Sequence, residues 1–419
     1  MKMTVIADDF TGALDTAVQF VQLGIPTAVA LQQGASVREL MKESDVAVFD
    51  TQSRHTDAQE AYRRVRSIAE RAVDVGCDII YKKTDSALRG NIGAELAAVA
   101  DAVRQSVHFV PAFPRMARTT KGGVQFSDGV PVSETGFGRD PLNPVRQSHI
   151  PDLIARQAPE KACVVVAQGT EEIGAEQDGT IFVYDAETDE ELRRWGAMLL
   201  GNAPCTVLAG CAGFASVIGR HYAPKHARLL PLKKTEKMAV LCGSVNPITR
   251  RQVERAEKEG FVRLNVRPEQ FLDDEYFSSP AGKRFAEQVQ QAVRGEAPVM
   301  ICTMDVDDSG EGEKKAEEMG LSRDEMARRI THFLGRTAQW LLEQNADMTL
   351  VATGGDTLSR MLQELGVVSL APLCEIGNGA VASRAVCADR TSLQIVSKSG
   401  GFGAEDIFLE IQRRVTEEA

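Results

Sequence analysis

Short apolar runs alternate with amphipathic stretches along the first half of the chain. The apolar runs are MTVIAD, TAVAL, DVAVFDT and DIIYKKTD. Between them, residues 12–24 and 58–76 repeat apolar positions at helical spacing. Runs that are apolar at nearly every position are typical of strands buried on both faces, and their alternation with helices indicates a parallel sheet. The pattern predicts an α/β fold.

Two interruptions divide this pattern. Gly and Pro crowd residues 114–151, which we interpret as an excursion with one hairpin. Pro and four Lys residues fall within APKHARLLPLKKTEK, which is typical of a domain boundary. A second α/β series follows, including a long helix over 322–344. With 419 residues, the chain predicts two α/β domains with mainly parallel sheets, over 1–232 and 238–419.

Composition narrows the class of protein. A net charge of −11 argues against a nucleic-acid surface, which needs a basic stripe. The eight cysteines form no CxxC pair, so a zinc site is not expected. Reduced thiols in a cytoplasmic protein are expected instead. No apolar segment reaches the length of a membrane span, and the N-terminus shows no secretory signal, so no membrane partner is expected.

Three strands of the second half end in turns of small residues before a helix. These turns are VLCGSVNP, LVATGGDTLSR and IVSKSGGFGAED. Backbone N–H groups at a helix N-terminus favour phosphate, and glycine allows a close approach. Each turn alone is ordinary α/β connection chemistry, but three at the carboxyl ends of strands favour a ligand site. Because GxxxxGK[ST] and GxGxxG are both absent, neither a P-loop nor a dinucleotide fingerprint is present.

Charged residues gather after the strands of the first half. Asp8 and Asp9 follow the first strand, Arg54 follows a second, and Lys82–Asp85 end a third. One Asp could simply cap the next helix, worth about 0.5–2 kcal/mol, and the second asks for another role. Arginine grips a carboxylate with two hydrogen bonds and acids accept from hydroxyls, so this set predicts a site for a small hydroxylated carboxylate.

Several motifs in one order resemble a known family. They are ADDFTGALDTA, KKTDSALRGN, PAFPRMARTTKGG, DPLNPV, GSVNPITRRQ, ATGGDT and KSGGFG. They resemble the four-carbon acid sugar kinases over effectively the whole chain. The resemblance implies an N-terminal domain that binds a four-carbon aldonate, a C-terminal domain that binds ATP, and an active site in the interdomain cleft. GALDTAVQF looks closer to the D-threonate kinases than to the 3-oxo-tetronate kinases.

The resemblance also implies the site residues. The substrate-binding residues would be Asp9, Arg54, Lys82, Lys83, Thr84 and Asp85. The nucleotide-binding residues would be Ser244, Gly354, Gly355, Asp356, Thr357, Gly400 and Gly401. Asp9 would assist deprotonation of the terminal hydroxyl, O4, as the catalytic residue. Mg²⁺ is expected with ATP; its protein ligands are not assigned, and Asp356 is a candidate.

Other functions remain open on the sequence alone. Within the family, the substrate could be D-erythronate or a 3-oxo-tetronate. An aldonate dehydrogenase would fit glycine turns on parallel strands but lacks GxGxxG. A sensor would bind the sugar acid without turnover. A homodimer is a further expectation.

Overall fold

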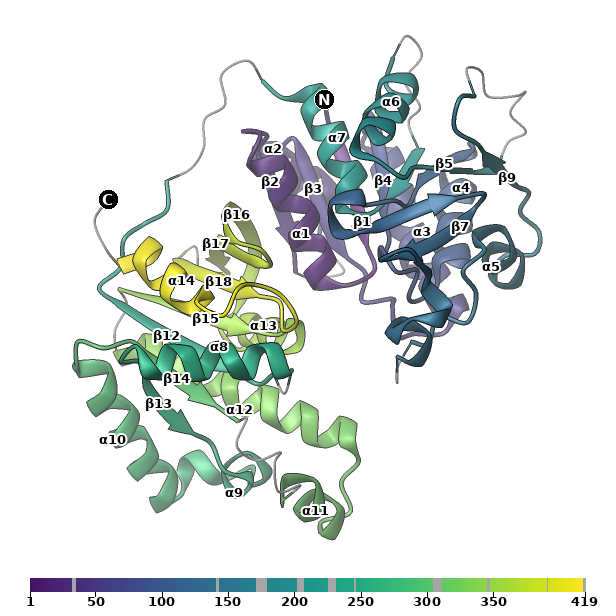
Figure 1. Ribbon diagram of the computed structural model, residues 1–419. Helices are drawn as coiled ribbons and strands as arrows, with labels where there is room; N and C mark the ends of the chain where they lie inside the picture. The colour runs from purple at the N-terminus through teal and green to yellow at the C-terminus, as the bar shows by residue number, and fades with distance from the viewer. Residues whose placement is uncertain are drawn as a thin grey trace. The chain divides into compact units, whose positions relative to one another are not determined.

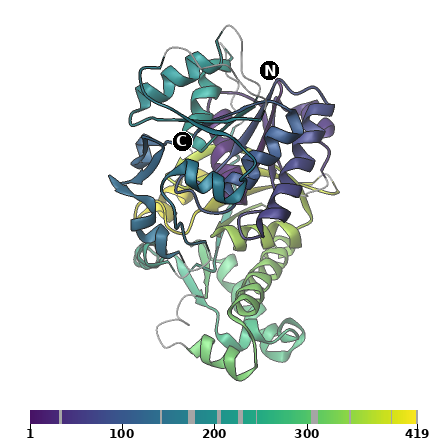
Figure 2. The same ribbon diagram turned by 90° about the vertical axis from the view of Figure 1, so that its right-hand side faces the viewer.

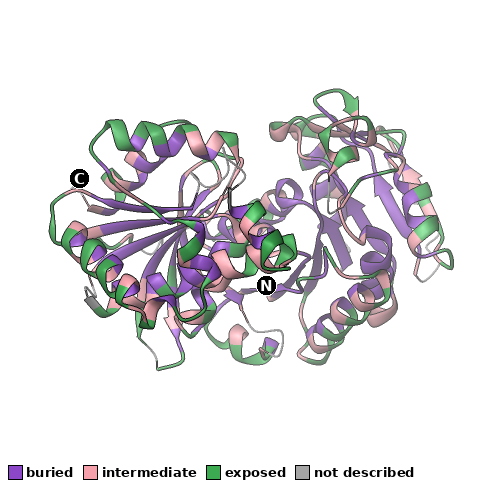
Figure 3. Cartoon of the chain, turned by 90° about the horizontal axis from the view of Figure 1, so that it is seen from below, coloured by how far each residue is buried: buried purple, intermediate pink, exposed green. Residues whose placement is uncertain are grey.

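The computed structural model divides into two compact units, Met1–Leu229 and Leu230–Ala419 (Figure 1). It describes residues 1–31, 35–140, 143–170, 179–201, 207–224, 231–244, 246–303, 311–344, 347–389 and 391–416. Two α/β units are what the sequence predicts, and the fold class is confirmed. In both units the strands are the buried layer and the helices expose one side (Figure 3).

The first unit is built on a parallel sheet. Its strands are β1 (Met3–Ala7), β2 (Thr27–Ala30), β3 (Val46–Asp50), β4 (Ile79–Lys83), β5 (Val107–Val110), β9 (Cys163–Val166), β10 (Ile181–Tyr184) and β11 (Val207–Gly210). They pair in the order β2-β3-β1-β4-β11-β5-β10-β9. In the register of β1, Ala7 lies opposite both Asp50 and Lys83. The carboxyl ends of β1, β3 and β4 therefore meet at one edge.

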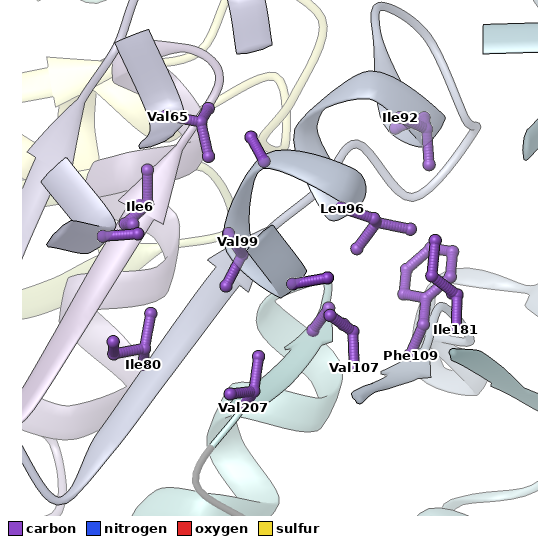
Figure 4. Close-up of a cluster of buried hydrophobic side chains, with 14 of the residues drawn as sticks. Ile6, Val65, Ile80, Ile92, Leu96, Val99, Val107, Phe109, Ile181 and Val207 are labelled. Carbon is purple, nitrogen blue, oxygen red and sulfur yellow. The ribbon is translucent and has the colours of Figure 1, made fainter. Parts of the chain in front are cut away.

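Helices cover both faces of this sheet. They are α1 (Phe10–Val21), α2 (Val37–Glu43), α3 (Ala58–Asp74), α4 (Ile92–Val103), α5 (Ile150–Gln157), α6 (Asp189–Leu199) and α7 (Ala212–Tyr222). Helix α7 contacts α1 and α6, while α4 contacts α3 and α5 (Figure 1). The core between the sheet and α3–α5 is built from aliphatic side chains such as Ile6, Ile80, Leu96 and Val99 (Figure 4). Because side chains alternate along a strand, residues 6, 80 and 82 face α4, and residues 5 and 83 face away from it.

The excursion predicted over residues 114–151 contains the expected hairpin. Strands β6 (Arg118–Lys121) and β7 (Val124–Ser127) pair antiparallel, and β8 (Val130–Pro131) adds to β7. Short 3₁₀ turns, η1 (Pro114–Met116), η2 (Val132–Glu134) and η3 (Gly136–Arg139), complete it. Asp185 fixes the tip, because its carboxylate accepts the backbone N–H groups of Gly122 and Gly123 at 2.6 and 2.9 Å.

The second unit has a mixed sheet. Its strands are β12 (Lys237–Cys242), β13 (Val262–Asn265), β14 (Val299–Cys302), β15 (Met348–Thr353), β16 (Val367–Gly377), β17 (Ala380–Cys387) and β18 (Ser392–Lys398). The order β13-β14-β12-β15-β18 is parallel, and β17 and β16 follow antiparallel. The strands β16 and β17, over 367–387, were not predicted from the sequence. The signal was Asn378-Gly379, a typical hairpin turn, where Gly379 has φ +76°.

Helices also flank the second sheet. They are α8 (Pro247–Lys258), α9 (Pro268–Leu272), α10 (Pro280–Arg294), α11 (Glu311–Glu318), α12 (Arg323–Gln344), α13 (Gly355–Glu364) and α14 (Ile407–Thr416), with η4 (Tyr276–Ser278). Helices α8 and α14 contact each other and share one core with β12. The long helix α12, light green in Figure 2, packs on α13. No helix within the described ranges is long and apolar enough to span a bilayer.

Candidate active site

Three loops carry charged residues to the carboxyl edge of the first sheet. Asp8 and Asp9 follow β1, the segment Thr51–Arg54 follows β3, and Thr84–Asp85 follows β4. The loop after β3 is held to the end of β1, because the backbone N–H groups of Ser53 and Arg54 donate to the Asp8 carbonyl at 3.0 and 3.2 Å. The structure thus brings together side chains that are separated by up to 77 positions in sequence.

Arg54 is the centre of this group. Its Nε donates to Asp8 Oδ2 at 2.7 Å and its Nη1 to Asp9 Oδ2 at 2.7 Å, and its Nη2 lies 3.8 Å from Asp85 Oδ1. The residue is 8% exposed. Burial alone would lower the pKa of Arg54, but the three carboxylates outweigh it and raise the pKa above its usual range. The guanidinium is therefore a permanent positive charge at the sheet edge.

The two aspartates after β1 play different parts. Asp9 caps α1, because its Oδ1 accepts the backbone N–H of Gly12 at 2.9 Å while Oδ2 binds Arg54. Asp8 is 1% exposed, and burial raises its pKa, but Arg54 and two lysines outweigh burial and hold the pKa below its usual value. Asp8 Oδ1 has no hydrogen-bond partner among the described residues. A capping aspartate and a second, ionised aspartate with a free oxygen stand side by side.

Lys83 and Thr84 add further polar groups to this edge. Lys83 is 4% exposed and faces α1. A Cβ on Gly12 would lie 2.7 Å from Lys83 Nζ and 2.5 Å from Asp9 Oδ1, so a side chain at this position would displace both groups. Thr84 Oγ1 is buried and, within the described part of the chain, has no hydrogen-bond partner. Gly12 was not predicted as a site residue, although its position three residues after Asp9 in ADDFTG was a signal.

Asp85 accepts several hydrogen bonds within its own loop, which the sequence did not predict. Its carboxylate binds the Arg89 guanidinium through two contacts of 3.0 Å and accepts the backbone N–H of Ala87 at 3.2 Å. Burial raises the pKa of Asp85, but Arg54 and Arg89 outweigh it and lower the pKa well below its usual range. Asp85 therefore shapes its own loop as well as facing Arg54.

Lys82 is not offered to a ligand. Its side chain is 0% exposed and lies on the opposite face of the sheet from Lys83, paired with Glu95 of α4 at 2.9 Å. The role of substrate contact that the resemblance implies for Lys82 needs correction, because an enclosed ammonium cannot reach a substrate. Glu95 was not predicted as part of the site, because NIGAELAAVADAV has the pattern of an ordinary helix.

Asp50 is a further residue that sequence reasoning missed. It ends β3, and its Oδ1 accepts the backbone N–H of Gln52 at 2.9 Å. This turn places Gln52 at φ +49°, an uncommon conformation for a residue other than glycine. Burial, with the nearby charges of Asp9 and Asp8, raises the pKa of Asp50 to about 7, although the Gln52 N–H opposes it. The available signal was a third aspartate at a strand end, in VFDT.

The glycine turns of the second unit also meet at one edge. In register, Cys242 of β12 lies opposite Thr353 of β15, which lies opposite Lys398 of β18. Gly354 N donates to the Lys398 carbonyl at 2.9 Å. A Cβ on Gly400 would lie 3.0 Å from Ser244 Oγ. The structure therefore brings the predicted nucleotide-binding turns together within one unit.

Two helices begin at this edge. Helix α8 is capped by Asn246, whose Oδ1 accepts the Ile248 N–H at 2.9 Å. Helix α13 begins after Gly354, which has φ +95° and no side chain to cap the helix, so the first N–H groups of α13 are available to an anion. Asp356 is exposed in that first turn, and Thr357 is buried. Within the described ranges, no group of three His, Cys, Asp or Glu residues could hold a metal ion.

Lys398 fixes the turns to α8. Its Nζ donates to Thr249 Oγ1 at 3.2 Å and to the Gly400 carbonyl at 3.3 Å, and the Thr249 hydroxyl also donates to that carbonyl. The side chain is 1% exposed, and burial lowers the pKa of Lys398 to about 8. Only the glycines of KSGGFG were predicted as site residues in this turn. A lysine ending a buried strand was the signal, as with Lys83.

Two family models match the chain, one within each compact unit. Residues 3–218 match the family model of a sugar-binding N-terminal domain, and residues 239–408 match that of a nucleotide-binding C-terminal domain. The chain is similar to a D-threonate kinase of Salmonella typhimurium, with 29% identity over 430 residues, 97% of this chain and 96% of the relative.

Relatives with other substrates are about as similar. A D-erythronate kinase of Heliobacterium modesticaldum is 29% identical over 437 residues, 97% of this chain and 95% of the relative. A 3-oxo-tetronate kinase of Pseudomonas savastanoi is 27% identical over 434 residues, 98% and 96%. A solved structure from Salmonella typhimurium superposes with a TM-score of 0.80 at 25% identity, covering 99% of this chain and 100% of that one.

Proposed function

The chain belongs to the four-carbon acid sugar kinases, and from this we propose that it transfers the γ-phosphate of ATP to the terminal hydroxyl, O4, of a four-carbon aldonate. The observation that carries the proposal is the group around Arg54. A buried cation, two carboxylates and oxygens of Asp8 and Thr84 that have no partner among the described residues lie at the carboxyl edge of a parallel sheet, where such folds bind ligands.

The charges suit a small sugar acid. Arg54 and Lys83 supply positive charge for the substrate carboxylate, and Asp9, Thr84 and Asp85 can bond its hydroxyls. A buried polar atom without a partner costs free energy, so ligand hydroxyls that satisfy Asp8 Oδ1 and Thr84 Oγ1 add both affinity and orientation. Asp9 is the least buried of the acids that bind Arg54, and we assign it to the attacking hydroxyl.

The nucleotide belongs to the second unit. Ser244, Gly354–Thr357, Gly400 and Gly401 would hold the phosphates, because the start of α13 offers free N–H groups and Gly354 leaves open space where a side chain would stand. Mg²⁺ commonly binds through one or two carboxylates plus the phosphates, and Asp356 fits that pattern as an exposed carboxylate in the first turn. The interdomain cleft stays a prediction.

We propose D-threonate as the first substrate to test, because the segment GALDTAVQF resembles that of the D-threonate kinases. Phosphoryl transfer depends on positioning and charge neutralisation, so the correct aldonate is the one whose hydroxyls satisfy the site. Purified protein is incubated with ATP, Mg²⁺ and D-threonate, L-threonate, D-erythronate or 3-oxo-tetronate, and ADP is measured. We expect the highest kcat/KM with D-threonate. A higher value with another acid would reassign the substrate, and no ADP with any acid would refute the kinase proposal.

Asp9→Asn tests the role of this residue. The amide keeps the cap on α1 and an acceptor oxygen but loses the negative charge and nearly all basicity, so kcat should fall about 10²–10⁴-fold while ATP KM barely changes. Asp57→Asn is the matched control: Asp57 caps α3 in the same way, through the Glu60 N–H at 2.9 Å, and is exposed. Equal kcat in both variants would make Asp9 a cap and leave Asp8 as the better candidate.

A further inference from the structure

A fully buried ion pair lies beneath the Arg54 group. Lys82 of β4 and Glu95 of α4 are both 0% exposed, with Nζ 2.9 Å from Oε2. Removing two charges from water is costly, and replacing such a pair by apolar side chains of similar volume is often neutral or stabilising. A buried ion pair is thus weak evidence of a stabilising role, and the groups that these two residues contact are the better guide to their function.

Lys82 ties together the ends of two strands. Its Nζ donates to the carbonyl of Ile6 in β1 at 3.1 Å and to the carbonyl of Lys83 at the end of β4 at 2.6 Å. Ile6 precedes Asp8 by two residues, and Lys83 directly precedes Thr84. One ammonium therefore fixes the origins of two of the three loops that carry the site.

Glu95 holds the third loop. Its Oε1 accepts the hydroxyl of Ser53, the residue directly before Arg54. The Ser53 hydroxyl also lies 2.6 Å from Thr51 Oγ1, which donates to the Ala7 carbonyl at 2.7 Å. From the same end of α4, Asn91 Nδ2 donates to the Ser53 carbonyl at 2.9 Å. The loop after β3 is thus bound to α4 and to β1 at the point where Arg54 begins.

We propose that Lys82 and Glu95 are positioning residues that set the spacing of the three loops, and so preorganise Arg54 and its acids for the substrate carboxylate without touching it. The pair contacts the strand ends that lead into two of the loops and Ser53 in the third, from the side of the sheet opposite Lys83. When the site residues are held within a few tenths of an ångström before binding, little of the substrate's binding energy is lost in ordering them. The substrate part of the proposal rests on the proposed kinase function.

The double variant Lys82→Met/Glu95→Leu tests it. Both charges disappear together, so no buried charge is left unpaired, while the loops lose their common anchor. We expect KM for D-threonate to rise about 10–100-fold and KM for ATP to change less than twofold. The matched control is Lys161→Met/Asp101→Leu, which removes another ion pair of α4 in the same unit, distant in sequence from the three loops. It should leave both KM values unchanged.

Amide hydrogen exchange gives a readout without substrate. The N–H groups of Ser53 and Arg54 are protected by the Asp8 carbonyl, and their exchange should become at least tenfold faster in the double variant. If the double variant does not fold, Ser53→Ala removes only the hydroxyl bound by Glu95, with the same changes expected at a few-fold. A folded variant with unchanged exchange and unchanged KM for the acid overturns the proposal. If the wild type phosphorylates no acid, the kinase function fails and exchange alone decides on positioning.

Discussion

Replacing Arg54 by methionine leaves Asp8, Asp9 and Asp85 without their shared cation. Methionine keeps much of the side-chain volume, so the change is chiefly electrostatic. Removing one partner of a buried ion pair costs about 3–5 kcal/mol, because the remaining charge is buried and unpaired. Arg54 and Asp8 are almost fully buried, so this range applies to them, whereas the more exposed Asp9 contributes less. We expect the first unit to lose about 3–5 kcal/mol of unfolding free energy near pH 7.5.

The loss should depend on pH with a definite sign. In the wild type the pKa values of Asp8 and Asp85 are lowered, so their contribution is present above the unfolded pKa of about 4 and is lost as the pH falls below it. Without the guanidinium, fewer charges oppose burial at Asp8 and its pKa rises, whereas Asp85 keeps Arg89, so the variant loses the part of this pH dependence that comes from Asp8. The difference between the two proteins should therefore shrink by about 1–3 kcal/mol between pH 7.5 and 4.5.

Urea unfolding followed by tryptophan fluorescence measures the loss of unfolding free energy in the first compact unit. Trp195 is buried in α6 of the first unit, and Trp340 lies in α12 of the second, so a Trp340→Phe background reports the first unit alone. Arg66→Met is the control, because Arg66 pairs with Glu70 on the exposed side of α3, where solvent screens the pair, and its loss should be much smaller than that of Arg54→Met. A loss below 1 kcal/mol for Arg54→Met, or an equal loss at both pH values, would refute the reasoning.

Three further variants test other groups. Asp50→Asn should flatten the pH dependence of the unfolding free energy between about pH 4 and 7. A carboxyl whose pKa is raised to about 7 in the folded state makes the wild type less stable as the pH rises over that range, and the amide does not titrate. Parallel curves for variant and wild type would contradict this. Gly354→Ala should raise ATP KM at least tenfold and leave the acid KM unchanged, since φ +95° strains any side chain by about 1–3 kcal/mol; normal ATP affinity by calorimetry would exclude that turn. In the wild type, ATP binding should weaken as the pH rises through about 8, because Lys398 then loses its positive charge. Lys398→Met should remove this pH dependence, and a wild-type affinity independent of pH would argue against a charge role for Lys398.

Much of the fold could be predicted because its signals are local. Buried strands, amphipathic helices and glycine turns depend on residues a few positions apart, and they predicted two mainly parallel sheets and the hairpin of the excursion. The antiparallel strands β16 and β17 were missed, since their irregular register breaks the alternating pattern and only Asn378-Gly379 marked the turn. The places where strands end, with an acid or a base directly after them, were likewise visible.

Which of those charged residues share a site was decided only by the tertiary structure. Lys82 and Lys83 are neighbours of the same type, yet side chains alternate along a strand, so one meets Glu95 beneath α4 and the other faces α1 and Asp9. The sequence by itself determined the α/β units and the strand ends that carry the chemistry. The structure alone decided the face of each side chain, its burial and hence its pKa, because these depend on strand order and on helices distant in sequence.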